Sequence, residues 1–142
     1  TETPDYRLNP EMEMPTVRID DREYIGVLSI PALGRELPVI SSWDYPGLRV
    51  APCRYTGSAY TDDLVIAAHN YASHFGRLRE LSQGDSIRFT DTDGNVFDYV
   101  VSELEILEPY AVSQMTEGDW DLTLFTCTPG GQYRVTLRCN RI

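Results

Sequence analysis

The stretch DLTLFTCTPGGQYR, residues 121–134, combines an apolar run, a cysteine and a tight turn. Leu122 to Thr126 is typical of a buried strand, and it ends immediately before Cys127. The Pro-Gly-Gly segment at 129–131 predicts a turn, because Pro fixes φ and Gly tolerates positive φ. A second strand is predicted to begin at Arg134. The turn brings the start of this strand, and so Arg134, back toward the Cys127 sulfur. A thiol at a strand end is a candidate for a reactive cysteine, although a buried structural cysteine beside a hairpin is the competing interpretation.

A second apolar run, DLVIAAH at 63–69, ends in His69 and is followed by Asn70. Its lack of polar interruptions predicts a strand that is buried on both faces. Arg134 is a permanent cation of the kind that stabilises an oxyanion. Cys, His and Arg at strand ends are the components of a thiol acyl-transfer site. We therefore predict that strands 63–69 and 121–127 are parallel neighbours, with His69 and Cys127 at the same edge.

These residues carry a resemblance to a known family. TLFTC, residues 123–127, resembles the TLxTC signature of the sortases, the cysteine transpeptidases of Gram-positive cell surfaces. IGVLSIPALGRELPVI at 25–40 resembles the opening hairpin of that family, and VIAAHNYASHFGRLREL at 65–81 resembles its catalytic-His strand and helix. GDSIRFTDTDGNVFDYVV at 84–101 resembles the central hairpin, and CTPGGQYRVTLRCNR at 127–141 the closing segment. The similarity covers about residues 24–142.

The resemblance implies an all-β fold, a sortase-like closed β-barrel of about eight strands with one or two short helices. Short strands punctuated by Pro and Gly agree with such a barrel. It also implies a catalytic domain at 21–142, after a linker or loosely docked arm at 1–20. The implied activity is cleavage of a Leu-Pro-x-Thr-Gly-like sorting signal through a Cys thioester. The product would then be joined to a cell-wall or pilin amine.

The implied site consists of His69, Cys127 and Arg134, with Asn70 and Thr126 as candidates for substrate binding. In this mechanism Cys127 attacks the carbonyl, Arg134 stabilises the oxyanion, and His69 transfers protons. Arg138 is an alternative for the oxyanion role, because it shares the strand parity of Arg134. Arg134 is preferred, since it lies nearer the end of the strand that leads to Cys127.

Composition limits the function without identifying a partner. The 142 residues suit one domain, and 42% hydrophobic with 24% charged residues is ordinary for a globular protein. The net charge of −10 argues against a nucleic-acid or anionic-lipid partner, and it also favours solubility. No run approaches the ~18 apolar residues of a membrane span. If the resemblance holds, the family's N-terminal anchor is absent here, and we expect an ectodomain on the extracellular face of the membrane.

Three cysteines leave at least one unpaired thiol if all bonds are internal, and Cys127 is the candidate. Cys53 and Cys139 are expected to be two buried thiols, with a disulfide between them as the alternative. No cofactor or metal is implied: Cys53, His69, His74 and Cys127 lack zinc-ligand spacing. The acidic residues Asp62, Asp63, Glu103 and Glu105 leave calcium open, without the spacing of a ligand loop.

The remaining elements follow from local patterns. Strands are predicted at 24–30 and 36–41 around the turn at 31–34, and at 85–90 and 96–107 around Asp93-Gly94. A weaker strand is predicted at 47–51, a loop at 52–61, a helix at 73–81 and a connection at 108–119. Two rival functions compete with this one: a cysteine hydrolase of papain or caspase type, and a barrel that binds peptides without turnover. The papain-like order places Cys before His, the reverse of His69 and Cys127, and no caspase-type signature surrounds Cys127, so both features argue against the hydrolase.

Overall fold

The computed structural model describes residues 4–68, 78–108, 120–126 and 134–142. Within these ranges the chain forms nine strands and a few short helical segments. The strands are β1 Val17–Ile19, β2 Arg22–Ile30, β3 Arg35–Ile40, β4 Cys53–Thr56, β5 Leu64–Ala68, β6 Ser86–Asp91, β7 Val96–Leu107, β8 Leu122–Thr126 and β9 Arg134–Arg141. The helical segments are α1 Asp5–Leu8, α2 Tyr45–Val50 and the 3-10 turns Pro31–Leu33 and Leu78–Glu80.

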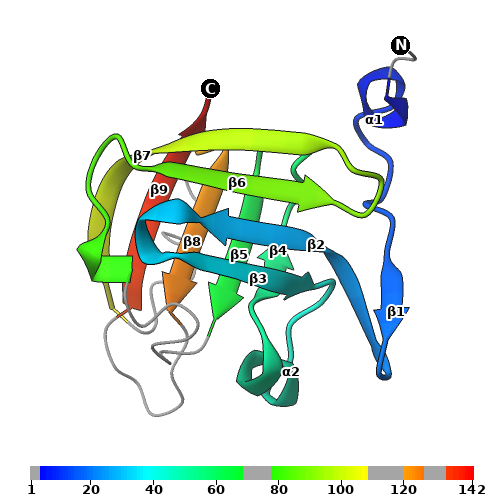
Figure 1. The fold of residues 1–142 in the computed structure, drawn as a ribbon, viewed down its shortest axis with the longest axis horizontal. Coiled ribbons are helices and arrows are strands. Elements are labelled where there is room, and N and C mark those ends of the chain that lie inside the picture. Colours follow the sequence, from blue (N-terminus) through cyan, green and yellow to red (C-terminus); the bar gives the residue numbers. More distant parts are fainter. Residues whose placement is uncertain (1–3, 69–77, 109–119, 127–133) are drawn as a thin grey trace.

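The strands close into a barrel (Figure 1). The order is β2-β3-β4-β5-β8-β9-β7-β6, and β6 pairs back onto β2 through Gly26↔Asp91 to Ser29↔Arg88. β1 lies outside this ring, paired antiparallel with the start of β2. Closure leaves no open edge among the eight strands of the ring. The predicted closed barrel of about eight strands is confirmed.

Two apolar clusters pack on opposite faces of the β5–β8 part of the wall. The larger cluster fills the barrel and includes Leu64 and Ile66 of β5 and Leu122 and Leu124 of β8. The smaller cluster lies outside and is covered by α2 through Leu48, which is buried. Strand side chains alternate between faces, so both faces of β5 and β8 need apolar residues. Because both faces of β5 and β8 are buried, the sequences of the two strands are uninterrupted apolar runs.

The two hairpins expected from turn residues are present. β2 and β3 are joined by the 3-10 turn Pro31–Leu33, and β6 and β7 by the turn that contains Asp93 and Gly94. Gly94 has φ 86, which a residue with a Cβ adopts only at a cost. Asp91 stabilises the second turn, because its carboxylate accepts hydrogen bonds from the backbone N–H of Asp93 and Asn95.

Two local predictions are wrong. The segment 47–51 was predicted as a weak strand, but residues 47–50 lie within the helix α2, and Ala51 follows its end. Asp44 caps this helix by accepting a hydrogen bond from the Gly47 N–H at 2.5 Å, and Pro46 occupies the first turn. The segment 52–61 was predicted as a loop, but it contains β4. Only four residues pair in β4, too few for a clear alternation to appear in the sequence.

Other predictions fall partly outside the described residues. The predicted helix 73–81 is described only from residue 78, where a 3-10 turn begins, and Leu78 and Leu81 are buried. The connection 108–119 lies almost wholly outside the described residues. No helix in the described part of the chain is long and apolar enough to cross a membrane.

The N-terminal segment, predicted as a linker or loosely docked arm, contacts the barrel at several points. Tyr6 of α1 stacks on Tyr60, with ring centroids 4.8 Å apart and an interplanar angle of 11°. Met14 is 3% exposed, within the barrel cluster. The Thr92 hydroxyl donates a hydrogen bond to the Pro15 carbonyl at 3.1 Å. α1 lies at the end of the barrel opposite the tips of β5 and β8 (Figure 1).

Candidate functional site

The central feature of the site is the parallel pairing of β5 and β8. The two strands are in register from Leu64↔Leu122 to Ala68↔Thr126, and their arrowheads point to the same end of the barrel (Figure 1). The prediction that these strands are parallel neighbours is confirmed for residues 64–68 and 122–126. His69, Asn70 and Cys127 lie outside the described residues. In the sequence, His69 and Cys127 directly follow the two members of the last pair.

The outer face of these strands is apolar close to that end. Val65 and Ala67 of β5 and Phe125 of β8 belong to the outer cluster, whereas their neighbours along each strand face the barrel interior. Phe125 is 2% exposed. A dry surface of this kind strengthens electrostatic interactions at its margin. The outer face therefore suits a charged reaction centre better than an open, solvated sheet would.

Arg134 is directed toward the end of β8. It is the first residue of β9, opposite Leu107 of β7. Its Nη1 donates to the carbonyl oxygen of Thr126 at 3.4 Å, and its guanidinium lies over the ring of Phe125, 5.6 Å from the centroid. The Thr126 carbonyl belongs to the peptide that leads into Cys127. Among the predicted site residues, the structure therefore brings Arg134 and Thr126 together.

The side chain of Thr126 has a structural role. The residue is 4% exposed, and its hydroxyl accepts a hydrogen bond from the backbone N–H of Val135 at 3.0 Å. The last ladder pair between β8 and β9 is Phe125↔Thr136, so this bond extends the junction one step further. Substrate contact by Thr126 stays a prediction, and the described contacts give it a role in holding β9 against β8.

Arg138, the alternative oxyanion residue, is engaged elsewhere. Its Nε donates to Glu105 Oε2 at 2.8 Å and its Nη1 to the Thr123 hydroxyl at 3.1 Å. Its side chain is 4% exposed, compared with 38% for Glu105. Arg138 pairs with Thr123, whereas Arg134 reaches the last residue of β8. This arrangement favours Arg134 as the cation at the strand end.

The two described cysteines are separated by the barrel wall. Cys53 belongs to the outer cluster and Cys139 to the barrel interior, so both are buried thiols that are not joined to each other. The prediction of two buried thiols is confirmed. Burial raises the pKa of Cys139 to about 12, which keeps that thiol protonated and unreactive at neutral pH.

Three of the four acidic residues considered for calcium have other partners in the described structure. Asp62 forms an ion pair with Arg141 at 3.1 Å, and Asp63 accepts a hydrogen bond from the Ser58 N–H at 2.9 Å. Glu105 is paired with Arg138. Within the described ranges no group of three or more His, Cys, Asp or Glu side chains is arranged to hold a metal.

Sequence reasoning missed a row of aromatic side chains that begins at Phe125. Tyr55 packs edge-on against Phe125, with centroids 5.3 Å apart, and Trp43 stacks on Tyr55 at 5.8 Å. Tyr45 continues the row, edge-on to Trp43 at 5.5 Å. The four residues come from β8, β4 and the segment around the start of α2. No local pattern identifies the row, because only the barrel brings these segments together.

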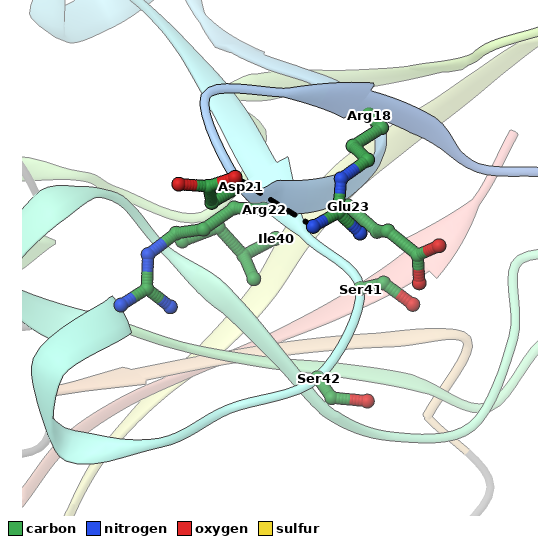
Figure 2. A pocket seen from close by; sticks show the side chains of 7 residues that line it. All are labelled: Arg18, Asp21, Arg22, Glu23, Ile40, Ser41 and Ser42. Atoms are coloured by element: carbon green, nitrogen blue, oxygen red, sulfur yellow. Dashed lines mark ion pairs between the residues drawn. The ribbon is translucent and has the colours of Figure 1, made fainter.

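A separate hollow of about 260 Å³ lies where β1, β2 and the end of β3 meet. Figure 2 shows Arg18 and Arg22 pointing in different directions, with Ser41 and Ser42 on the connection after β3. Arg18 pairs with Asp21 at 3.7 Å, and Arg22 pairs with Asp44 at 3.3 Å. Both arginines of the hollow are thus paired with carboxylates of the protein itself, and Glu23 adds a further negative charge to its lining.

The geometry can be compared with known proteins. The sortase domain family matches residues 28–142. The chain is similar to Sortase A of Bacillus anthracis, with 26% identity over 129 residues, 81% of this chain and 57% of the relative. It resembles the solved Sortase A from Corynebacterium diphtheriae, with a TM-score of 0.72 and 24% identity, covering 85% of this chain and 61% of that one.

A second solved structure, Sortase C from Streptococcus pneumoniae, has a TM-score of 0.72 and 26% identity. This match covers 88% of this chain and 68% of the Streptococcus chain. The chain thus spans about three fifths of the length of the Bacillus and Corynebacterium relatives, 57% and 61% respectively.

Proposed function

Because the chain belongs to the sortase family, we propose that it is a cysteine transpeptidase that cleaves a Leu-Pro-x-Thr-Gly-like sorting signal through a thioester on Cys127. The observation that carries the proposal is the in-register parallel pairing of β5 and β8. His69 and Cys127 each follow the last residue of one of these strands. Arg134 approaches the same end from β9 and contacts the Thr126 carbonyl.

We propose the following chemistry. The Cys127 thiolate attacks the Thr carbonyl carbon of the Thr–Gly peptide bond in the signal. The carbonyl oxygen becomes an oxyanion that the Arg134 guanidinium stabilises. The C–N bond then breaks as the His69 imidazolium donates its proton to the leaving amine. An incoming amine attacks the thioester carbonyl, neutral His69 accepts its proton, and the new amide forms as the Cys127 thiolate leaves.

The apolar outer face supports transfer to an amine over hydrolysis. Val65, Ala67 and Phe125 keep this part of the sheet dry, which limits the access of water to a thioester formed beside it. In the proposed mechanism His69 and Cys127 continue the alternation of their strands onto this face. Asn70 is proposed to line the substrate groove next to His69.

The substrates are proposed to be surface proteins that bear the sorting signal, on the extracellular face of a Gram-positive cell. The acceptor is proposed to be a cell-wall peptide amine or a lysine of a pilin. The pilin is included because the similar Sortase C of Streptococcus pneumoniae is described by its pilin substrate specificity. No metal or other cofactor takes part in the proposed chemistry.

The test is intact-mass spectrometry of the protein with a library of Leu-Pro-x-Thr-Gly-like peptides. We expect a thioester adduct that carries the part of the peptide ending in Thr, located on Cys127 and absent in Cys127→Ala. Addition of a glycine peptide, a cell-wall stem peptide or a pilin fragment should convert the adduct to a new amide, and the productive amine identifies the acceptor.

Iodoacetamide labelling provides the control for this assignment. In the folded protein Cys127 should be alkylated, while Cys53 and Cys139, both buried, should not react. An adduct that persists in Cys127→Ala, or that maps to Cys53 or Cys139, would contradict the proposed mechanism. Peptide binding without any adduct would identify a binding barrel that performs no turnover.

A further inference from the structure

Phe125 occupies the third position of the TLFTC stretch, two residues before Cys127. On β8 it pairs directly with Thr136 of β9, so Arg134 is its diagonal neighbour across the two strands. Diagonal neighbours on one face of a sheet are within reach of each other when one side chain is aromatic and the other long. The register of β8 and β9 therefore places a ring beside the cation of the proposed site.

The contact between these side chains is close. The Arg134 guanidinium carbon lies 5.6 Å from the centroid of the Phe125 ring, within the range in which a cation is attracted to a π face. The hydrogen bond from Arg134 Nη1 to Thr126 O is longer than usual, at 3.4 Å. On the opposite side, Arg134 is paired with Leu107 of β7, which packs against the outer cluster. The ring thus forms a wall on the β8 side of the guanidinium.

The Phe125 ring is itself held in place by other aromatics. Tyr55 meets it edge-on, with an interplanar angle of 83°, and Trp43 stacks on Tyr55 at 26°. Phe125 is 2% exposed, whereas Trp43 is 38% exposed at the outer part of the row. A ring fixed in this way offers the guanidinium one defined surface. Such preorganisation matters for a group that must meet a developing charge without rearranging.

We propose that Phe125 is a positioning residue for Arg134, and that Tyr55 supports it from behind. The Phe125 ring holds the guanidinium toward the end of β8, where the oxyanion of the proposed mechanism develops. This inference rests on the proposed function. Beyond that function, we infer that the row of aromatic side chains that begins at Phe125 affects the rate of the acyl-transfer step, because it positions Arg134.

The first test compares Phe125→Leu with Phe125→Tyr on a fluorogenic sorting-signal peptide. Leu keeps apolar bulk but removes the π face, so we expect kcat to fall about 5- to 20-fold, the effect of one cation–π contact, with KM within about twofold. Tyr keeps the ring, so kcat should stay within about threefold of the parent. Tyr55→Leu keeps the Phe125 ring but removes its edge-on support, so kcat should fall to a value between those of Phe125→Tyr and Phe125→Leu.

Two controls separate positioning from general damage. Ile40→Val removes one methylene group from the same outer cluster on β3, and kcat should stay within about twofold even if the melting temperature falls. The rate of Cys127 alkylation by iodoacetamide should be equal in Phe125→Leu and the parent, because Arg134 acts on the oxyanion. A parallel loss of alkylation rate would mean that Phe125 supports the thiol instead, and would overturn the inference.

A double-mutant cycle provides the second test. Arg134→Lys lacks the planar guanidinium, so Phe125→Leu should cost less in that background than in the parent. Equal losses in both backgrounds, or an unchanged kcat in Phe125→Leu, would overturn the positioning role. These outcomes differ from failure of the proposed function, in which the parent protein itself forms no Cys127-dependent adduct.

Discussion

Arg134 and Arg138 lie four residues apart on β9, yet the fold gives their guanidinium groups different surroundings. Arg134 is partly exposed at the strand end and contacts the Thr126 carbonyl and the Phe125 ring. Arg138 is almost fully buried, with its charge matched by Glu105. A cation that must respond to a transient charge needs an accessible position, whereas a buried cation with a fixed carboxylate serves the fold.

The two arginines should therefore separate catalysis from stability. Arg134→Ala should lower kcat about 100- to 1000-fold with little change in KM, because oxyanion stabilisation acts in the transition state. Arg134→Lys should recover only part of this loss. The measurement is kcat and KM for a fluorogenic sorting-signal peptide. A rise in KM at constant kcat would mean that Arg134 only binds the substrate.

Arg138→Ala is the matched variant on the same strand. It removes the hydrogen bonds to Glu105 and Thr123, so the free energy of unfolding should fall by about 2 kcal/mol, limited by the partial exposure of Glu105. Its kcat, corrected for the folded fraction, should remain close to that of the parent. If Arg138→Ala abolishes turnover while the protein stays folded, Arg138 is the oxyanion residue.

The pairing of β2 with β6 closes the barrel and depends on a glycine. Gly26 lies at a register shift in the β2–β3 ladder and faces Asp91 across the β2–β6 pairing. A Cβ at this position would collide with the backbone carbonyl oxygen of Thr90 and lie 2.9 Å from the Phe89 ring. A backbone atom cannot move aside as a flexible side chain can. The closure of the barrel therefore requires the absence of a side chain at residue 26.

Gly26→Ala should lower the free energy of unfolding by about 2–4 kcal/mol, because the new methyl group would push β6 away from β2. Urea denaturation followed by circular dichroism measures this change. Gly34→Ala is the control: its φ is 64, but nothing lies within 4 Å of the added Cβ. It should cost only about 1 kcal/mol, the strain of the left-handed backbone. Equal losses would show that backbone conformation, and not close approach, explains both glycines.

The molecule as a whole is organised by two apolar clusters on either side of one wall. The barrel interior contains the large rings Phe89, Phe97 and Tyr99, all of them fully buried. The outer cluster is smaller and lies between α2 and the strands that lead to the proposed site. Because the barrel closes around the first cluster, the second can carry the site without exposing the main core.

Burial of Cys139 in the first cluster predicts a dependence of stability on pH. Burial raises the pKa of Cys139 to about 12, whereas an unfolded thiol has a pKa of about 8.5. Between these values the unfolded chain releases a proton that the folded protein retains, so rising pH favours unfolding. The contribution of Cys139 is fully present below about pH 8.5 and decreases by up to about 1.4 kcal/mol per pH unit above it.

The measurement is the free energy of unfolding at several pH values from 8 to 11, in the parent and in Cys139→Ala. All other titratable groups are common to the two proteins, so the difference between them isolates the thiol. This difference should shrink as the pH rises. A constant difference would mean that Cys139 ionises as easily in the folded protein as in the unfolded chain.

Much of the fold could be predicted from the sequence because the relevant signals are local. Two uninterrupted apolar runs indicated β5 and β8, and the Asp93-Gly94 turn indicated the β6–β7 hairpin. The TLFTC stretch and the segments that resemble sortases identified the family and selected His69, Cys127 and Arg134. The prediction failed at 47–51 and 52–61, where a capped short helix and a four-residue strand carry weak periodic patterns.

The sequence by itself determined the family, the two apolar runs that form β5 and β8, and the order of the candidate catalytic residues, since each depends on neighbours along the chain. Tertiary structure alone decided that Arg138 is buried against Glu105, that Gly26 permits closure, and that Phe125 lies beneath Arg134. Arg138 and Glu105 are 33 residues apart, and Tyr55 and Phe125 come from different strands. Such contacts depend on register and barrel closure, which bring distant segments within a few ångströms of each other and have no counterpart in local residue order.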